Sequence, residues 1–195
     1  MDEVNRFGGR VTSRDGTAVA YERYGEGDGP PLVLVDGAPG TADGRALAGL
    51  LARRLPVVAY GRREHGGVER EVEDLAAVLA AVGPGAAVHG TGTGGVLALA
   101  AAAAGLPVGP VSVYEPPHAD VPLGRISARV LVVDGGFSPA ETRRAARELA
   151  AALPRARHRT LTGQTHEVAP HVLAPVLAEF LAESLAEERS FPGGS

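Results

Sequence analysis

The stretch "VHGTGTGGVLAL", residues 88–99, decides how the whole chain is interpreted. Val88 and His89 end an apolar segment of the kind that forms a buried strand. Four glycines and two threonines follow within residues 90–95, and an alanine-rich segment begins at Val96. Because glycine favours tight turns and alanine favours helix, the pattern predicts a strand, a sharp turn and a helix over residues 95–104.

Strands and helices alternate on both sides of this stretch. The chain opens with two strand-like segments that flank Asp15-Gly16, a pair favoured in two-residue type I′ hairpin turns. Apolar segments then alternate with segments whose apolar residues recur every three or four positions. The expected strands are LVLVDG, PVVAYG, GAAVHG, PVSVYE, ARVLVVDGG and RHRTLTG, and the expected helices include 139–153, capped by Ser138, and 169–187. This order predicts an α/β fold: a mostly parallel sheet of seven or eight strands with an N-terminal hairpin and helices on both faces.

Composition narrows the class of protein. The 195 residues suit one domain, which we place at 1–187 with a disordered tail at 188–195. The net charge of −4, with both signs interspersed, argues against a nucleic-acid or membrane partner and leaves a small molecule and a homo-oligomer open. The absence of cysteine excludes disulfides and thiolate chemistry. Without a signal peptide or a long apolar run, we expect a soluble, cytoplasmic protein.

The glycines also match the G-x-G-x-x-G pattern of dinucleotide-binding folds, through Gly90, Gly92 and Gly95. Glu115 ends the next strand, where an acid in such folds accepts a ribose hydroxyl. That motif normally opens the first strand–helix–strand unit of its domain. Here a hairpin and two strand–helix units precede it, so a dinucleotide binder is only our second alternative.

From about residue 11 to 185, the order of elements and four motifs resemble the α/β-hydrolase family. LVLVDGAPG resembles the strand and loop that supply one oxyanion-hole amide, with Asp36 in place of the usual histidine. VVAYGRREHGG resembles the family's Asp-Arg-x-Gly-His-Gly loop, with Gly61 and Glu64 as departures. VHGTGTGGVLALAAA resembles the strand, G-x-S-x-G elbow and helix. GQTHEVAPHVLAPVLAEFL is similar to the late loop and final helix, which implies that His166 is the family's catalytic histidine.

Three features depart from the family pattern. Gly92 stands where the elbow serine is expected, and it has no side chain to act as a nucleophile. Ser138 falls where the family's usual acid follows its strand. The connection 116–128 is near the minimum length for a parallel crossover, so we expect no cap or lid and a shallow, open cleft.

The resemblance implies a site at the carboxyl ends of the strands. His166 would act as a general base, and either Asp134 or Glu115 would orient it. The backbone amides of Ala38 and Thr93 would form an oxyanion hole, which does not depend on the missing hydroxyl. The implied substrate-binding residues are Asp36, Gly37, Ala38, Thr91, Gly92 and Thr93.

We expect the other polar residues near the elbow to have structural and not catalytic roles. A β-branched side chain tolerates the strained elbow conformation poorly, so we interpret Thr91 and Thr93 as turn residues that cap the helix. We expect His89 to be a core histidine with satisfied hydrogen bonds, and His158 has no partner visible in the sequence. No spacing of histidines and acids indicates a metal site, so we expect neither a metal nor a cofactor.

Three functions are consistent with these residues. The first is a serine-free enzyme acting on a small carbonyl, ester or epoxide substrate, by activated water or by a lyase, isomerase or cyclase step. The alternative is a non-catalytic relative whose cleft binds a small molecule or a partner protein. The second alternative is the dinucleotide binder described above.

Overall fold

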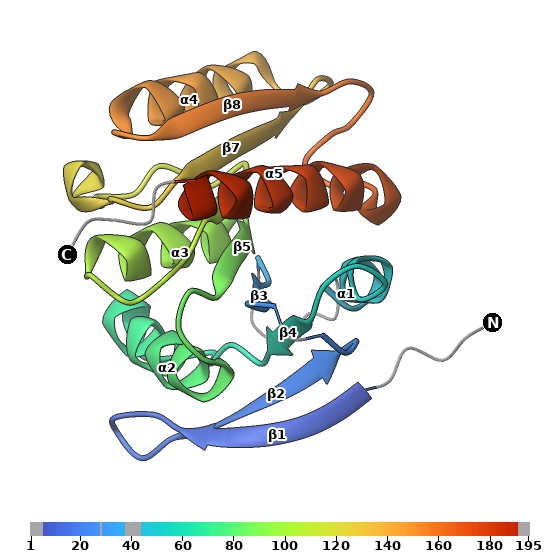
Figure 1. The fold of residues 1–195 in the computed structure, drawn as a ribbon. Helices are drawn as coiled ribbons and strands as arrows, with labels where there is room; N and C mark the ends of the chain where they lie inside the picture. The colour runs from blue at the N-terminus through green and yellow to red at the C-terminus, as the bar shows by residue number, and fades with distance from the viewer. Residues whose placement is uncertain (1–5, 28, 38–43, 191–195) are drawn as a thin grey trace.

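The computed structural model describes residues 6–27, 29–37 and 44–190, and its strands form one eight-stranded sheet (Figure 1). β1 (Arg6–Thr12) and β2 (Ala18–Tyr24) form an antiparallel hairpin, and β2 pairs antiparallel with β4 (Val57–Tyr60). All other neighbours are parallel, in the order β1-β2-β4-β3-β5-β6-β7-β8. The remaining strands are β3 (Leu32–Val35), β5 (Ala87–Thr91), β6 (Val111–Tyr114), β7 (Val130–Gly135) and β8 (Ala156–Leu161). The predicted fold class is confirmed.

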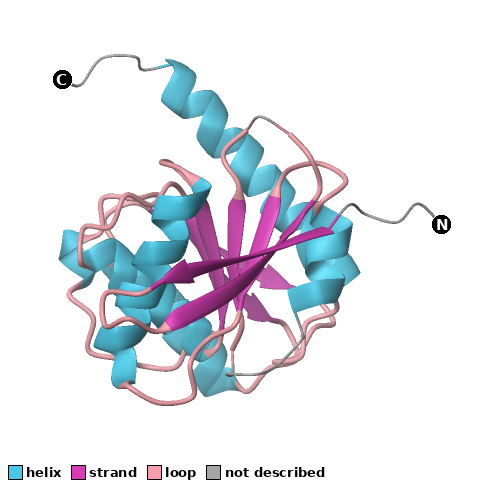
Figure 2. Ribbon diagram, turned by 90° about the horizontal axis from the view of Figure 1, so that it is seen from below, coloured by secondary structure: helices cyan, strands magenta, loops and turns pink. Residues whose placement is uncertain are grey.

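Helices cover both faces of the sheet (Figure 2). One face packs against α2 (Gly67–Val82), α3 (Thr93–Ala103) and α4 (Ala140–Ala152), and the other against α1 (Gly44–Leu51) and α5 (Pro170–Ser190). Between β6 and β7 the described chain forms only one short 3₁₀ turn, η1 (Leu123–Arg125), so no cap stands over the sheet there. None of the described helices is both long and apolar enough to cross a lipid bilayer.

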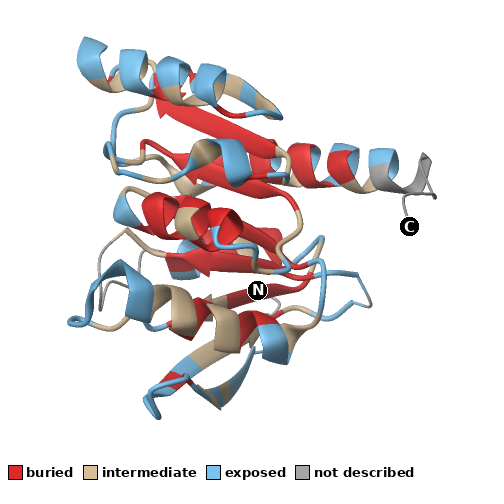
Figure 3. Ribbon diagram, turned by 90° about the vertical axis from the view of Figure 1, so that its left-hand side faces the viewer, coloured by how far each residue is buried: buried red, intermediate tan, exposed pale blue. Residues whose placement is uncertain are grey.

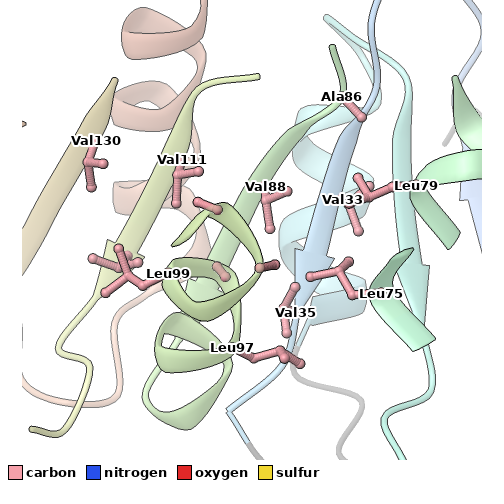
Figure 4. Close-up of a cluster of buried hydrophobic side chains, with 14 of the residues drawn as sticks. Val33, Val35, Leu75, Leu79, Ala86, Val88, Leu97, Leu99, Val111 and Val130 are labelled. Atoms are coloured by element: carbon pink, nitrogen blue, oxygen red, sulfur yellow. The ribbon is translucent and has the colours of Figure 1, made fainter. Parts of the chain in front are cut away.

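The central strands are buried on both faces (Figure 3) because their side chains alternate between two cores. In β3, Val33 and Val35 join the cluster under α2 and α3, whereas Leu32 and Leu34 join the cluster under α1 and α5. Figure 4 shows the first of these clusters, with Val33 and Val35 among its labelled members. This double burial holds the carboxyl ends of the strands, and the loops that leave them, in fixed positions.

The turn of the hairpin differs from the prediction. The loop spans residues 13–17, and Gly16 has a positive φ of 88° while Asp15 does not. Asp15 instead accepts a hydrogen bond from the Thr17 amide at 3.0 Å, and its carboxylate pairs with Arg63 at 2.9 Å. The predicted two-residue type I′ turn is therefore wrong, because the Asp15 side chain stabilises a longer loop.

The predicted cap of α4 is also wrong. The residue before the helix is Pro139, and no side chain caps its first amides. Ser138 is buried, and its Oγ has no hydrogen-bond partner among the described residues. A Cβ added at Gly135 would lie 2.8 Å from this oxygen, so the serine side chain lies against the end of β7. At the other end of the chain, α5 continues to Ser190, beyond the predicted tail boundary at 188, and residues 191–195 lie outside the described part.

Candidate active site

Gly92 forms the sharp turn between β5 and α3. Its φ of 50° and ψ of −123° are angles that residues with a side chain rarely adopt. The neighbouring glycines are required for a different reason, because α3 approaches the strands closely. A Cβ added at Gly94 would lie 2.2 Å from the Val35 carbonyl oxygen, and one at Gly90 would lie 2.3 Å from the Gly94 carbonyl oxygen. Packing therefore accounts for these glycines without a bound dinucleotide.

A histidine–carboxylate pair lies at the same edge of the sheet. His166 Nδ1 is 3.0 Å from Glu115 Oε2, and the other carboxylate oxygen accepts a hydrogen bond from the Gly135 amide at 2.8 Å. The Glu115 side chain is only 1% exposed, whereas that of His166 is 69% exposed. Glu115 adopts a positive φ of 44°, a strained conformation often found at functional sites. Of the two acids expected to orient His166, the structure brings Glu115 to it.

The loop that carries His166 is held by hydrogen bonds from the sheet. The Tyr114 hydroxyl donates to the Thr165 carbonyl at 2.5 Å, and the Phe137 amide donates to the Gln164 carbonyl at 2.8 Å. The Gln164 side chain accepts from the Ala169 amide at 2.9 Å, just before α5 begins. Burial raises the pKa of the Tyr114 hydroxyl well above its usual value, so this donor keeps its proton. These contacts fix where the imidazole stands.

Gly92 and His166 face each other. A Cβ added at Gly92 would lie 4.0 Å from His166 Cε1 and 3.9 Å from Gly37 Cα. A side chain at this turn would therefore project toward the imidazole, and Gly92 leaves that space open. Gly37, in the loop that follows β3, borders the same space.

Arg62 holds the parts of this edge together, which the sequence did not indicate. Its guanidinium donates to the Asp36 carbonyl at 2.7 Å and to the Thr93 hydroxyl at 3.0 Å. It also makes two parallel hydrogen bonds to the Glu71 carboxylate, at 2.9 and 3.0 Å. The Thr93 hydroxyl in turn donates to the Gly37 carbonyl, so it joins two loops and does not cap α3. The available signal was the arginine of the loop motif, which we quoted without assigning it a role.

Asp134, the other acid expected to orient His166, pairs with a different histidine. Its Oδ2 lies 2.9 Å from Nε2 of His158 on the edge strand β8. The acid points to this neighbour because Asp134 and Thr160 are register partners, which brings β8 alongside it. The interpretation of Asp134 as an orienting acid for His166 is therefore corrected, and His158 gains the partner that its sequence context did not show.

An open cleft joins these elements. It has a volume of about 1340 Å³, and Asp36, Gly37, Thr91, Gly92, Thr93, Glu115 and His166 all line it. Ala38 lies outside the described residues. At the inner end His89 also lines the cleft, with Nδ1 2.7 Å from the Ser112 hydroxyl and no partner for Nε2 among the described residues. The expectation that His89 is fully satisfied is therefore only half right. Within the described ranges, no group of three or more histidines and acids is arranged to hold a metal ion.

Solved structures of other proteins share this arrangement of elements. The chain is similar to an α/β hydrolase from Sphaerobacter thermophilus, with 35% identity and a TM-score of 0.80 over 89% of this chain and 100% of that one. A dienelactone hydrolase from Anabaena variabilis is 14% identical, with a TM-score of 0.79 over 94% and 99% of the two chains. A thermophilic esterase from Thermogutta terrifontis is 15% identical, with a TM-score of 0.75 over 93% and 98%. The last two likenesses show a shared fold alone.

No family model matches the chain, and no curated protein matches it.

Proposed function

Because the chain belongs to the α/β-hydrolase family, we propose that it is a hydrolase that works without a serine nucleophile. In this proposal Gly92 stands where the family carries its serine, and His166 activates water directly. The substrate is a small ester, lactone or epoxide that enters the open cleft. The observation that carries the proposal is the His166–Glu115 pair facing Gly92, because a base and its orienting acid are retained beside a turn that has no hydroxyl.

The hydrogen bond to Glu115 determines which imidazole nitrogen reacts. Because Nδ1–H of His166 donates to the carboxylate, Nε2 keeps its lone pair. For an ester, water attacks the carbonyl carbon while Nε2 takes one of the water's protons, and the C=O electrons move to the carbonyl oxygen. The tetrahedral intermediate then collapses, and the leaving alkoxide takes the proton back from Nε2. Glu115 stabilises the imidazolium that exists between these two proton transfers.

Backbone donors would stabilise the negative oxygen of the intermediate. The amides of Thr93 and Gly94 begin α3 and have no carbonyl partner within the helix, and the positive end of the helix dipole favours an anion there. We assign one donor of the oxyanion hole to the Thr93 amide, and the second donor expected from the sequence, the amide of Ala38, lies outside the described residues. Arg62 supports this hole, because it binds the backbone of one loop and the side chain of the other.

A panel of aryl esters, lactones and epoxides tests the proposal. We expect wild-type turnover that falls by about 10²- to 10⁴-fold in His166→Ala, the usual contribution of a general base. His171→Ala is the matched control, because His171 is exposed on the first turn of α5 and does not line the cleft. Equal turnover by wild type and His166→Ala would overturn the role of the imidazole.

A covalent probe separates the serine-free route from ordinary serine hydrolysis. A fluorophosphonate should leave the wild type unlabelled and should label Gly92→Ser, whose hydroxyl would project toward His166. Labelling of the wild type at a threonine would contradict a mechanism without a covalent intermediate.

The second candidate function is a non-catalytic small-molecule-binding protein. It is favoured by the lack of a nucleophile at Gly92 together with the large, open cleft. Ligand binding without turnover of any compound in the panel would support this alternative over the hydrolase.

A further inference from the structure

His89 is a buried titratable side chain that the proposed reaction does not use. It lies on β5 three positions before Gly92, and it is 2% exposed. Because side chains alternate along a strand, His89 points to the same face as Ala87, toward the core formed with α1 and α5. His89 is nevertheless one of the residues that line the cleft.

The hydrogen bonds of this imidazole are incomplete. Nδ1 lies 2.7 Å from the Ser112 hydroxyl on the neighbouring strand β6, and Nε2 is buried without a partner in the described part of the chain. Burial lowers the pKa of His89 to about 4, so the ring is neutral near pH 7. A neutral imidazole offers one donor and one acceptor, and only one of them is used here. Nε2 is thus a buried, unsatisfied nitrogen in a residue that lines the cleft, and a ligand group that packs into this part of the cleft would supply its missing partner.

The surroundings of His89 restrict what this ligand group can be. Leu34, its register partner on β3, lines the inner end of the cleft together with Leu47 and Leu173. A charged group would be costly to bury among these side chains, and an apolar group would leave Nε2 unpaired. A hydroxyl both donates and accepts, so it pairs with either tautomer of the ring, whereas a carbonyl can only accept. We propose that His89 Nε2 binds a hydroxyl at the far end of an otherwise apolar substrate group.

The position of His89 sets the shape of that substrate. His89 and Gly92 are three positions apart on extended chain, which puts their Cα atoms about 10 Å apart. A phenol joined through a two-carbon chain to the reacting carbonyl spans a distance of this order. The inference rests on the proposed function only in placing that carbonyl beside Gly92, since hydroxyl binding by His89 can be measured without turnover.

Two ketones that cannot be hydrolysed test the inference by calorimetric titration. They are 4-(4-hydroxyphenyl)butan-2-one and 4-phenylbutan-2-one, which differ by the one hydroxyl. We expect the wild type to bind the hydroxylated ketone about 3- to 10-fold more tightly, as one net hydrogen bond provides. In the double variant His89→Leu with Ser112→Ala, which leaves neither partner of the buried pair unsatisfied, this preference should disappear while 4-phenylbutan-2-one binds as before.

Imidazole ¹⁵N NMR of the wild type provides a direct readout that does not depend on the variant folding. His89 is identified in a pH titration of the ring signals by its lowered pKa, which burial causes. Its ring signals should shift on addition of the hydroxylated ketone and not on addition of the other. Equal affinity of the wild type for both ketones, a preference retained in the double variant, or unchanged His89 signals would each overturn the inference. Because none of these measurements needs catalysis, failure of the hydrolysis panel would be a separate result.

Discussion

The molecule contains two histidine–carboxylate pairs on neighbouring strands, and they differ in their surroundings. Glu115 follows β6 and binds His166, and Asp134 lies near the end of β7 and binds His158. The distances are 3.0 and 2.9 Å, and both carboxylates are buried. The histidines differ, because the side chain of His166 is 69% exposed in the cleft while that of His158 is 23% exposed on the edge strand β8.

The two pairs also differ in the hydrogen bonding of the second carboxylate oxygen. In Glu115 it accepts the Gly135 amide, so the acid is held from both sides and can orient an exposed imidazole. In Asp134, Oδ1 has no partner in the described structure, so the acid depends on His158 alone. We infer that the first pair performs chemistry and that the second attaches β8 to the sheet. A pairing distance by itself does not distinguish the two roles.

The largest expected difference between the two pairs is in kcat/KM when the charge of each acid is removed. We expect Glu115→Gln to lower kcat/KM for the best substrate of the panel by about 10²- to 10⁴-fold, because the amide favours the wrong tautomer of His166. Asp134→Asn, the matched change in the second pair, should leave kcat/KM within about threefold. Steady-state kinetics of the two purified variants measures both values, and a similar loss in both would break the distinction.

His89 provides a third case to compare with the two histidine–carboxylate pairs, because it is a buried histidine whose partner is a hydroxyl and not a carboxylate. Its pKa of about 4 lies below the unfolded value of 6.5, so between these pH values the unfolded chain binds the proton more readily. The free energy of unfolding is therefore highest, as far as His89 is concerned, above pH 6.5. It falls by about 3 kcal/mol in total as the pH is lowered from 6.5 to 4. Urea unfolding at pH 7, 5.5 and 4 measures this slope. The slope should be shallower in the His89→Leu, Ser112→Ala double variant, and an unchanged slope would count against a neutral His89.

The two histidines should differ in their effect on stability. His158→Ala leaves the buried Asp134 carboxylate without a partner, and we expect it to lower the free energy of unfolding by about 2 kcal/mol. His166→Ala should change it by no more than about 0.5 kcal/mol, because that ring is exposed and Glu115 keeps its amide donor. Chemical denaturation of both variants shows which one is less stable. Greater destabilisation by His166→Ala would contradict a structural role for the His158–Asp134 pair and a catalytic role for the His166–Glu115 pair.

The smallest expected effect concerns the elbow beside the first pair. Gly92→Ser places a side chain at a φ of 50°, which should cost about 1 kcal/mol of stability, seen as a melting temperature a few degrees lower. Gly92→Ala is the control that carries the same backbone strain without a hydroxyl. If the serine variant alone gains reactivity toward the fluorophosphonate, the pair next to Gly92 is shown to activate a nucleophile.

Two details of the fold differ from what the local sequence pattern predicted. Asp15 was expected in a two-residue turn, yet its contacts with Thr17 and Arg63 stabilise a longer loop. Ser138 was expected to cap α4, yet it turns toward Gly135. Arg63 reaches Asp15 only in the folded chain, and the capping position of α4 is taken by Pro139, which has no side-chain hydrogen-bonding group.

The alternation of apolar strands and periodic helices was sufficient to predict the α/β fold, because burial on two faces requires that pattern in any chain with such a sheet. The glycine turn also followed from local sequence, whereas the placement of His166 came from the resemblance of its loop to the α/β-hydrolase family. The choice between Glu115 and Asp134 did not follow from local sequence, since both residues lie at the carboxyl ends of buried strands and both carry a carboxylate. Only the tertiary structure decided it, because the order of the strands and the register of β8 determine which imidazole each acid can reach.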